Sequence, residues 1–289
     1  MEEKPILGII GGSGFYKFPG LEDVQTVELD TPFGKPSAPI VIGTLHERRV
    51  AFLARHGLGH TLMPAEVNYR ANIYAFKALG VQFVVGVSAC GSLRHDFIPG
   101  HIVVPDQVVD FTRGRTSSFF DGGLVAHIGV AEPFCKELSA MLVTAADQSQ
   151  ANVHKGGVFI TIEGPRFSTR AESNLFRAWG ISIIGMTTCP EAFLAREAEL
   201  SYATLAHITD YDVWHVTEAP VSVDMVVCTL NENALKASET ISNLVKLLPK
   251  SADCSCTHAL ADAIISDRTL ISPQARQKLG ILVEKYLPS

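Results

Sequence analysis

The chain lacks the features that mark several large classes of protein. None of its apolar runs approaches the roughly 20 residues that a membrane-spanning helix needs, and its first residues, MEEKPILGII, are acidic where a secretory signal is basic. Lysine and arginine form no cluster, and the formal net charge is −6. Because nucleic acids and anionic membranes are bound by clustered basic residues, neither partner is expected. We therefore expect a soluble cytoplasmic protein.

Cysteine is also sparse. A chain that is 47% hydrophobic can bury a core without a disulfide framework. The spacing Cys254-Ser-Cys256 leaves a redox pair or a metal-binding pair open. No second Cys-x-Cys motif or neighbouring histidine cluster supports either use, so reduced core thiols are favoured. The six cysteines are Cys90, Cys135, Cys189, Cys228, Cys254 and Cys256.

Two familiar phosphate-binding fingerprints are missing as well. The glycine-rich turn at 11–14, GGSG, follows the apolar run KPILGII, but FYK after it fits neither G-x-G-x-x-G nor G-x-x-x-x-G-K-[ST]. Backbone N–H groups and the Ser13 hydroxyl could cradle a phosphate. On this stretch alone a tight turn without a ligand is favoured, and a dinucleotide-binding regulatory module is disfavoured.

What is present is an alternation of apolar runs and amphipathic segments, which indicates an α/β domain. Nearly continuous apolar character indicates strands covered on both faces, in a parallel or mixed central sheet flanked by helices. Residues 1–250 are expected to form the main domain, with 251–289 as a small helical C-terminal extension of it. Strands are expected near residues 4–10, 39–45, 49–55, 82–88, 100–105, 157–164, 181–186 and 202–209, and helices near 64–79, 132–147, 169–179, 190–200 and 222–248.

Capping-box spacing marks the start of two of these helices, at Thr169-x-x-Glu172 and at Thr188-x-x-Glu191. Polar residues follow several strands, where α/β sheets bind ligands. Arg55 offers a planar fork for a phosphate and His56 a further donor; a surface arginine beside a satisfied histidine is the alternative. Gly57 and Gly59 argue against a helix that would pair His56 with His60 on a metal.

Two aspartates end the last expected strand. Asp210 and Asp212 share a side of an extended chain because side chains alternate. If desolvated, one can hold a proton for a ring nitrogen while the other accepts from an exocyclic amine. A solvated turn is the alternative. Ser88, after another strand, offers close backbone approach, and Cys90 beside it is expected to be a buried thiol.

Six segments together resemble a known family: IIGGSGFY, ARHGLGHTLMPAEVNYRANIYAFKALG, SACGSLR, IEGPRFSTRAES, IIGMTTCPEAFLAREAEL and ITDYDVW. In order and spacing, over residues 5 to about 248, they resemble the S-methyl-5′-thioadenosine phosphorylases. These are a branch of the trimeric purine nucleoside phosphorylases. The fold implied is the single α/β domain of that family.

The resemblance also implies roles for individual residues. Asp210 would be the catalytic acid and Asp212 its partner on adenine. Met186 would bracket the ribose, Phe167 and Ser168 would line the base pocket, Val223 would face the 5′ substituent, and His127 would reach a neighbouring subunit's site. Phosphate would be held by Ser13, Arg55, His56, Ser88, Ala89 and Thr187.

The reaction implied is phosphorolysis of S-methyl-5′-thioadenosine to adenine and 5-methylthioribose 1-phosphate. Inorganic phosphate would be the co-substrate, with no organic cofactor and no metal. A homotrimer or hexamer with sites near its interfaces is expected. The alternatives are a broader purine nucleoside phosphorylase that accepts adenosine or inosine, and a nucleoside hydrolase.

The sequence departs from relatives of this family in two respects. Gly185 stands where animal relatives have asparagine. Arg196 and Ser201 stand where some archaeal relatives have cysteines, so their disulfide pattern is not expected here.

Overall fold

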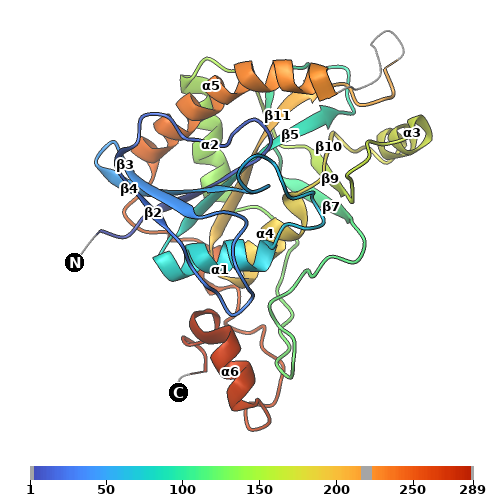
Figure 1. The fold of residues 1–289 in the computed structure, drawn as a ribbon. Helices are drawn as coiled ribbons and strands as arrows, with labels where there is room; N and C mark the ends of the chain where they lie inside the picture. The colour runs from blue at the N-terminus through green and yellow to red at the C-terminus, as the bar shows by residue number, and fades with distance from the viewer. Residues whose placement is uncertain (1–2, 216–222, 288–289) are drawn as a thin grey trace.

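The structure is a computed structural model that describes residues 3–215 and 223–287, except for the side chains of 223–232 (Figure 1). Within these ranges eleven strands form one mixed sheet. The main path runs β2-β3-β4-β1-β5-β10-β9-β7; β11 pairs with β5 and β6, and β6 with β8. The strands are β1 (Leu7–Gly11), β2 (Glu22–Val27), β3 (Ile40–Leu45), β4 (Arg48–Ala54), β5 (Phe83–Ser92), β6 (Ile102–Val104), β7 (Gln107–Phe111), β8 (Val153–Lys155), β9 (Val158–Ile162), β10 (Ile183–Gly185) and β11 (Ser201–Asp210).

Strand β5 is the branch point that opens the sheet. It runs parallel to β1 and to β11, but its last residues, Gly91 and Ser92, pair with antiparallel β10. The register of β11 against β5 shifts between Ile208 and Asp210. Because β4, β1, β5 and β11 are parallel, their carboxyl ends lie at one edge, where ligands bind in such sheets.

Helices cover both faces of the sheet (Figure 1). The helices α1 (Tyr69–Leu79) and α4 (Thr188–Glu197) lie together on one face, and α2 (Lys136–Gln148) and α5 (Val223–Leu247) on the other. The smaller α3 (Arg170–Ala178) lies at the end near β9 and β10. The expected α/β fold with a mixed sheet between helices is confirmed. No helix in the described ranges is long and apolar enough to cross a membrane.

Of the helix-capping signals in the sequence, those of α1 and α3 are confirmed and that of α4 is not. At α1, Gly80 takes the left-handed conformation and caps the helix end, and the capping box of α3 forms as predicted, with Thr169 and Glu172 bonded to each other's backbone. The capping box predicted at Thr188 is wrong. Cys189 has a non-helical backbone, and the Glu191 side chain binds Arg55 instead of a helix end.

Three strands were not predicted from the sequence. Strand β2 is mostly polar and almost wholly exposed, β7 is half-exposed, and β8 has only three residues. None of them shows the buried apolar run that identified the others.

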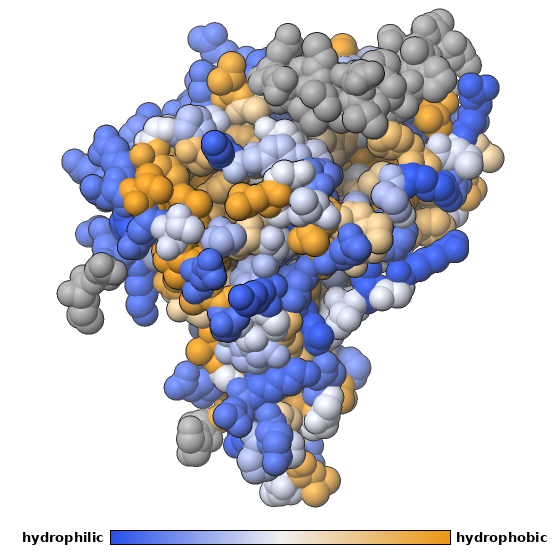
Figure 2. All heavy atoms as spheres, viewed as in Figure 1, coloured by the Kyte–Doolittle hydropathy of each residue, from blue (hydrophilic) through white to orange (hydrophobic). Residues whose placement is uncertain are grey.

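The C-terminal segment projects from the body of the molecule, as the red end of the chain in Figure 1 shows. It contains η1 (Ser255–His258), α6 (Pro273–Leu279) and η2 (Gly280–Leu282). A bridge between Ala126 and Ile264 joins it to the segment that follows β7. Its visible surface is mostly hydrophilic (Figure 2), while Leu260 and Leu279 are buried in the main hydrophobic core.

Candidate active site

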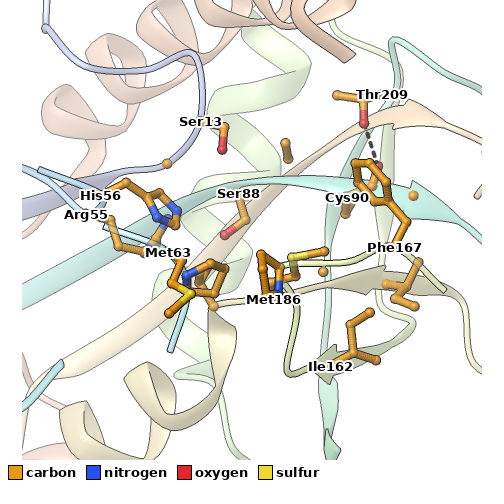
Figure 3. Close-up of a pocket in the computed structure, with 18 of the residues that line it drawn as sticks. Ser13, Arg55, His56, Met63, Ser88, Cys90, Ile162, Phe167, Met186 and Thr209 are labelled. Atoms are coloured by element: carbon orange, nitrogen blue, oxygen red, sulfur yellow. Dashed lines mark hydrogen bonds between the residues drawn. The ribbon is translucent and has the colours of Figure 1, made fainter. Parts of the chain in front are cut away.

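A cavity of about 940 Å³ opens at the shared carboxyl edge of the central strands. Figure 3 shows Arg55, His56 and Ser88 on one side of it and Thr209, Cys90 and Phe167 on the other. Eleven of the residues expected from the sequence line this cavity: Ser13, Arg55, His56, Ser88, Ala89, Phe167, Ser168, Met186, Thr187, Asp210 and Asp212. Segments far apart in the chain therefore meet in one polar and apolar chamber.

Arg55 follows β4 and is completely buried. Its Nε and Nη2 bind the two carboxylate oxygens of Glu191 at 2.7 and 2.8 Å, and its Nη1 donates to the carbonyl of Val87 at 2.9 Å. Burial opposes the charge, but the Glu191 carboxylate outweighs it and raises the pKa of Arg55. The Nε and Nη2 edge of the guanidinium, which could have bound phosphate in a bidentate way, is therefore occupied by Glu191. One N–H on each of Nη1 and Nη2 remains for a ligand.

His56 differs from the expected donor. Its Nδ1 lies 2.9 Å from the carbonyl oxygen of Leu62, so Nδ1 carries the proton when the ring is neutral. Burial, with Arg55 close by, lowers the pKa of His56 to about 4. At neutral pH the remaining nitrogen, Nε2, is therefore an acceptor, suited to a hydroxyl or to a phosphate oxygen that still carries its proton.

The turn after β1 closes on this corner of the cavity. A Cβ on Gly12 would lie 2.5 Å from the carbonyl oxygen of Val87 and 2.8 Å from Nη1 of Arg55, so only glycine fits. Ser13 and Gly14 then line the cavity. The buried hydroxyl of Ser88 has no hydrogen-bond partner among the described residues. It is available to an anion beside Arg55.

The opposite corner holds two buried carboxyls. Asp210 is 9% exposed, its Oδ1 accepts from the backbone N–H of Asp212 at 2.7 Å, and its Oδ2 lies 2.6 Å from Thr209 Oγ1. Burial raises the pKa of Asp210 to about 6, against its two hydrogen bonds; the charge of Asp212 contributes least. The desolvation on which the sequence-based hypothesis depended is therefore the largest cause of the shift.

Thr209 gives Asp210 a way to keep a proton. Its hydroxyl has a single proton and two acceptors in reach, Asp210 Oδ2 and the carbonyl oxygen of Cys90 at 3.2 Å. It can donate to the carbonyl and accept from a protonated Asp210 at the same time. No local pattern singles out Thr209 beyond its place beside Asp210.

Asp212 and Ser168 face the same space. Burial raises the pKa of Asp212, and its Oδ2 has no partner among the described residues. The buried hydroxyl of Ser168 is likewise unpaired within them. Gly91 allows this packing, since a Cβ there would lie 3.0 Å from Asp210 Oδ1. Both residues line the cavity, so each has a polar atom available to a group that fills this corner.

Apolar side chains separate the two polar corners. Met186 and Phe167 were expected here from the sequence. The apolar and aromatic lining residues that were not expected are Tyr16, Met63, Pro64, Ile162, Pro165 and Ile184. Also not expected at the site were Glu191 and Arg115, whose guanidinium donates to the carbonyls of Met186 and Cys189 at 2.7 and 2.9 Å and so fixes that loop. Their partners are too distant in the chain for a local pattern to reveal.

Two expected residues are not placed in the cavity. His127 is exposed on the segment that pairs with the C-terminal extension, and it does not line the cavity of its own chain. The side chain of Val223 lies outside the described residues. Gly185 does line the cavity, and a Cβ there would lie 2.6 Å from Phe159, which gives its departure from asparagine a steric reason.

Comparison with known proteins identifies the family to which this chain belongs. A model of the phosphorylase superfamily matches residues 6–246. The S-methyl-5′-thioadenosine phosphorylase of Geobacter sulfurreducens is 49% identical over 283 residues, which cover 98% of this chain and 99% of the relative. This chain belongs to the methylthioadenosine phosphorylase family. The same-named protein of Nitrosopumilus maritimus is 47% identical, over 91% of this chain and 99% of its own.

Solved structures of methylthioadenosine phosphorylases share the fold. One from an Antarctic soil metagenomic library is 44% identical, with a TM-score of 0.92 over 97% of this chain and 99% of its own. The methylthioadenosine phosphorylase of Schistosoma mansoni, solved in complex with adenine, is 40% identical, with a TM-score of 0.79 over 84% of this chain and 92% of its own. The family resemblance predicted from the sequence is confirmed.

Proposed function

We propose that this protein cleaves S-methyl-5′-thioadenosine with inorganic phosphate, giving adenine and 5-methylthioribose 1-phosphate. The observation that carries the proposal is one cavity with a cationic and hydroxyl-lined corner at Arg55 and Ser88 and a buried acidic corner at Asp210 and Asp212. The named relatives, of nearly equal length, support the same reaction.

Phosphate belongs in the corner formed by Ser13, Arg55, His56, Ser88, Ala89 and Thr187. Arg55 offers its two remaining N–H groups from a position fixed by Glu191. Ser88 offers an unpaired hydroxyl. A fixed nucleophile turns attack on the sugar carbon into an effectively intramolecular step, and its negative charge stabilises the oxocarbenium character that develops there.

Adenine belongs in the opposite corner, with Met186 toward the ribose and Phe167 and Ser168 beside the base. Adenine leaves poorly as an anion, so N7 must gain a proton as the glycosidic bond breaks. Asp210 supplies that proton from its contact with Thr209, and Asp212 accepts from the exocyclic amine. Proton donation of this kind contributes about 10²- to 10⁴-fold in rate.

The working molecule is proposed to be a cytoplasmic homotrimer. His127, exposed in the single chain, would complete the 5′-methylthio pocket of a neighbouring subunit, and Val223 would face the same group. No group beyond phosphate is required by this chemistry.

Release of adenine, measured over a range of phosphate concentrations, tests the function. We expect release from S-methyl-5′-thioadenosine to require phosphate and to yield 5-methylthioribose 1-phosphate in equal amount. Release without phosphate would identify a hydrolase. Faster turnover of adenosine or inosine than of S-methyl-5′-thioadenosine would identify a broader purine nucleoside phosphorylase.

A further inference from the structure

Three cysteines that are distant in the chain meet near the start of β11, away from the cavity. Cys135 precedes α2, while Cys254 and Cys256 flank the start of η1. Their three sulfur atoms lie within 4.8 Å of one another, and those of Cys135 and Cys254 are 3.7 Å apart. Cys135 and Cys256 are buried, and Cys254 is partly exposed.

The spacing of the sulfurs distinguishes two uses of such a cluster. A disulfide brings two sulfurs to about 2.05 Å. Thiolates around a tetrahedral metal, with metal–sulfur bonds of about 2.3 Å, lie about 3.8 Å apart. The 3.7 Å separation of the Cys135 and Cys254 sulfurs is close to the second value, and all three sulfurs lie within 4.8 Å of one another.

Further polar groups surround the cluster. Cys135 Sγ donates toward Cys254 Sγ, and the Ser201 hydroxyl lies 3.1 Å from the Cys254 sulfur. Cys135 stands at the N-terminus of α2, whose dipole favours negative charge. A fourth donor is close, because Glu137 Oε2 lies 3.3 Å from the sulfur of Cys135.

We propose that Cys135, Cys254 and Cys256 bind one thiophilic divalent cation such as Zn²⁺, with the Glu137 carboxylate as fourth ligand. Each thiol releases its proton to solvent as its sulfur coordinates the metal. The site joins the C-terminal segment to α2 and to the start of β11. Asp210 ends the same strand, nine residues further on and about 30 Å away. The metal is therefore structural and takes no part in phosphorolysis.

Cobalt is the sharpest probe, because thiolate–Co²⁺ sites absorb in the near ultraviolet and tetrahedral Co²⁺ absorbs strongly in the visible. We expect the full chain, reduced and freed of metal, to bind one equivalent of Co²⁺ with both signals. Zn²⁺ should displace the Co²⁺ and raise the melting temperature by several degrees. Adenine release at 25 °C should be the same with and without Zn²⁺.

Single variants locate the site. Cys135→Ser and Cys256→Ser should each weaken Co²⁺ binding at least tenfold and abolish the shift in melting temperature. Cys189→Ser, which removes a buried thiol outside the cluster, should keep both the Co²⁺ binding and the shift in melting temperature. The proposal is overturned if reduced wild-type protein shows no thiolate–Co²⁺ band, or if Cys135→Ser binds Co²⁺ as tightly as wild type and with the same band.

Discussion

The carboxyl of Asp210 is the group on which the proposed chemistry depends most. Replacing it in Asp210→Asn leaves the shape of the cavity intact but removes the transferable proton. We expect kcat/KM for S-methyl-5′-thioadenosine to fall about 10²- to 10⁴-fold, or roughly 3–5 kcal/mol. The preference should shift toward inosine, because an amide can donate to N7 and a 6-oxo group together. Steady-state assays with both nucleosides measure this, and an unchanged preference would contradict the assigned role.

The pH profile provides a separate check on the same carboxyl. Asp210 acts as an acid only while protonated, and its pKa is raised to about 6. At saturating phosphate, kcat/KM should therefore fall as the pH rises above about 6. This limb should be missing from the residual activity of Asp210→Asn. A basic limb that persists in the variant would assign it to another group.

Stability should follow the same titration. Because the folded pKa of about 6 exceeds the ordinary value of 3.8, the folded state binds this proton more tightly. The contribution to the free energy of unfolding is present below about pH 4 and is lost by about pH 6, on the order of 3 kcal/mol. Asp210→Asn lacks it. The difference between wild type and variant in urea unfolding should change across this range and stay constant above it.

How far the sequence could define the site depended on local signals. Arg55 and His56 are adjacent and Asp210 and Asp212 are two positions apart, each pair after an apolar run, so both groupings could be predicted. Glu191 pairs with Arg55 across 136 positions, and no periodicity connects them. The protonation of His56 was also unreadable, because the carbonyl that fixes it belongs to a loop.

The ion pair between Arg55 and Glu191 joins the end of β4 to α4. Both side chains are almost fully buried. In Glu191→Gln the guanidinium would lose its countercharge while remaining in the interior. We expect a loss of about 3–5 kcal/mol in the free energy of unfolding, measured with urea, and a higher KM for phosphate because Arg55 is no longer held.

A matched control lies on the surface. Arg94 and Asp96 form a similar fork, with 60% of the Asp96 side chain exposed. Asp96→Asn should cost less than about 1 kcal/mol. Equal losses in the two variants would show that burial of the pair at Arg55 has no special weight.

The capping box at the start of α3 fixes the entry of the chain into the base pocket, because Phe167 and Ser168 directly precede Thr169. Thr169→Ala removes the hydroxyl that accepts from the N–H of Glu172. We expect a loss of about 1 kcal/mol in stability and a higher KM for the nucleoside with kcat little changed. Thr144→Ala, on the exposed face of α2, is the control and should be neutral or slightly stabilising. A similar loss there would assign the effect to threonine itself.

The two capping boxes show that the same local pattern can be overridden by a contact with a distant residue. The same spacing occurred at Thr169 and at Thr188, and one of them formed. The acid expected to cap the helix at Thr188 is Glu191, and its carboxylate binds Arg55 instead. Arg55 is buried, and leaving its charge without a partner would cost more free energy than leaving the helix end uncapped. The long apolar strand β11 was predicted to within one residue at each end, and the start of β5 was predicted equally well, but β5 continues four residues past the expected end to Ser92. Polar β2 depended on pairing with β3 and left no local pattern.

The molecule as a whole adds contacts that no single segment carries. The sheet brings the ends of β1, β4, β5 and β11 to one edge, and the opposite end of β11 meets the three cysteines. The spacing of Cys254 and Cys256 marks them as a pair, but no local pattern places Cys135 beside them, because it lies 119 positions from Cys254. Such meetings are set by topology, and they follow from the sequence only once the fold is known.

Sharing of sites between subunits gives the last prediction. If His127 completes a neighbour's pocket, His127→Ala alone should lower kcat/KM for S-methyl-5′-thioadenosine. When His127→Ala and Asp210→Asn chains are dissociated and reassembled together, some sites receive Asp210 from a His127→Ala chain and His127 from a neighbouring Asp210→Asn chain. With equal amounts and random mixing, about a quarter of the sites should regain full activity. Asp210→Asn mixed with Asp212→Asn is the control, because both residues come from one chain and mixing cannot restore them. Activity equal to the sum of the separate variants in the first mixture would exclude the shared site.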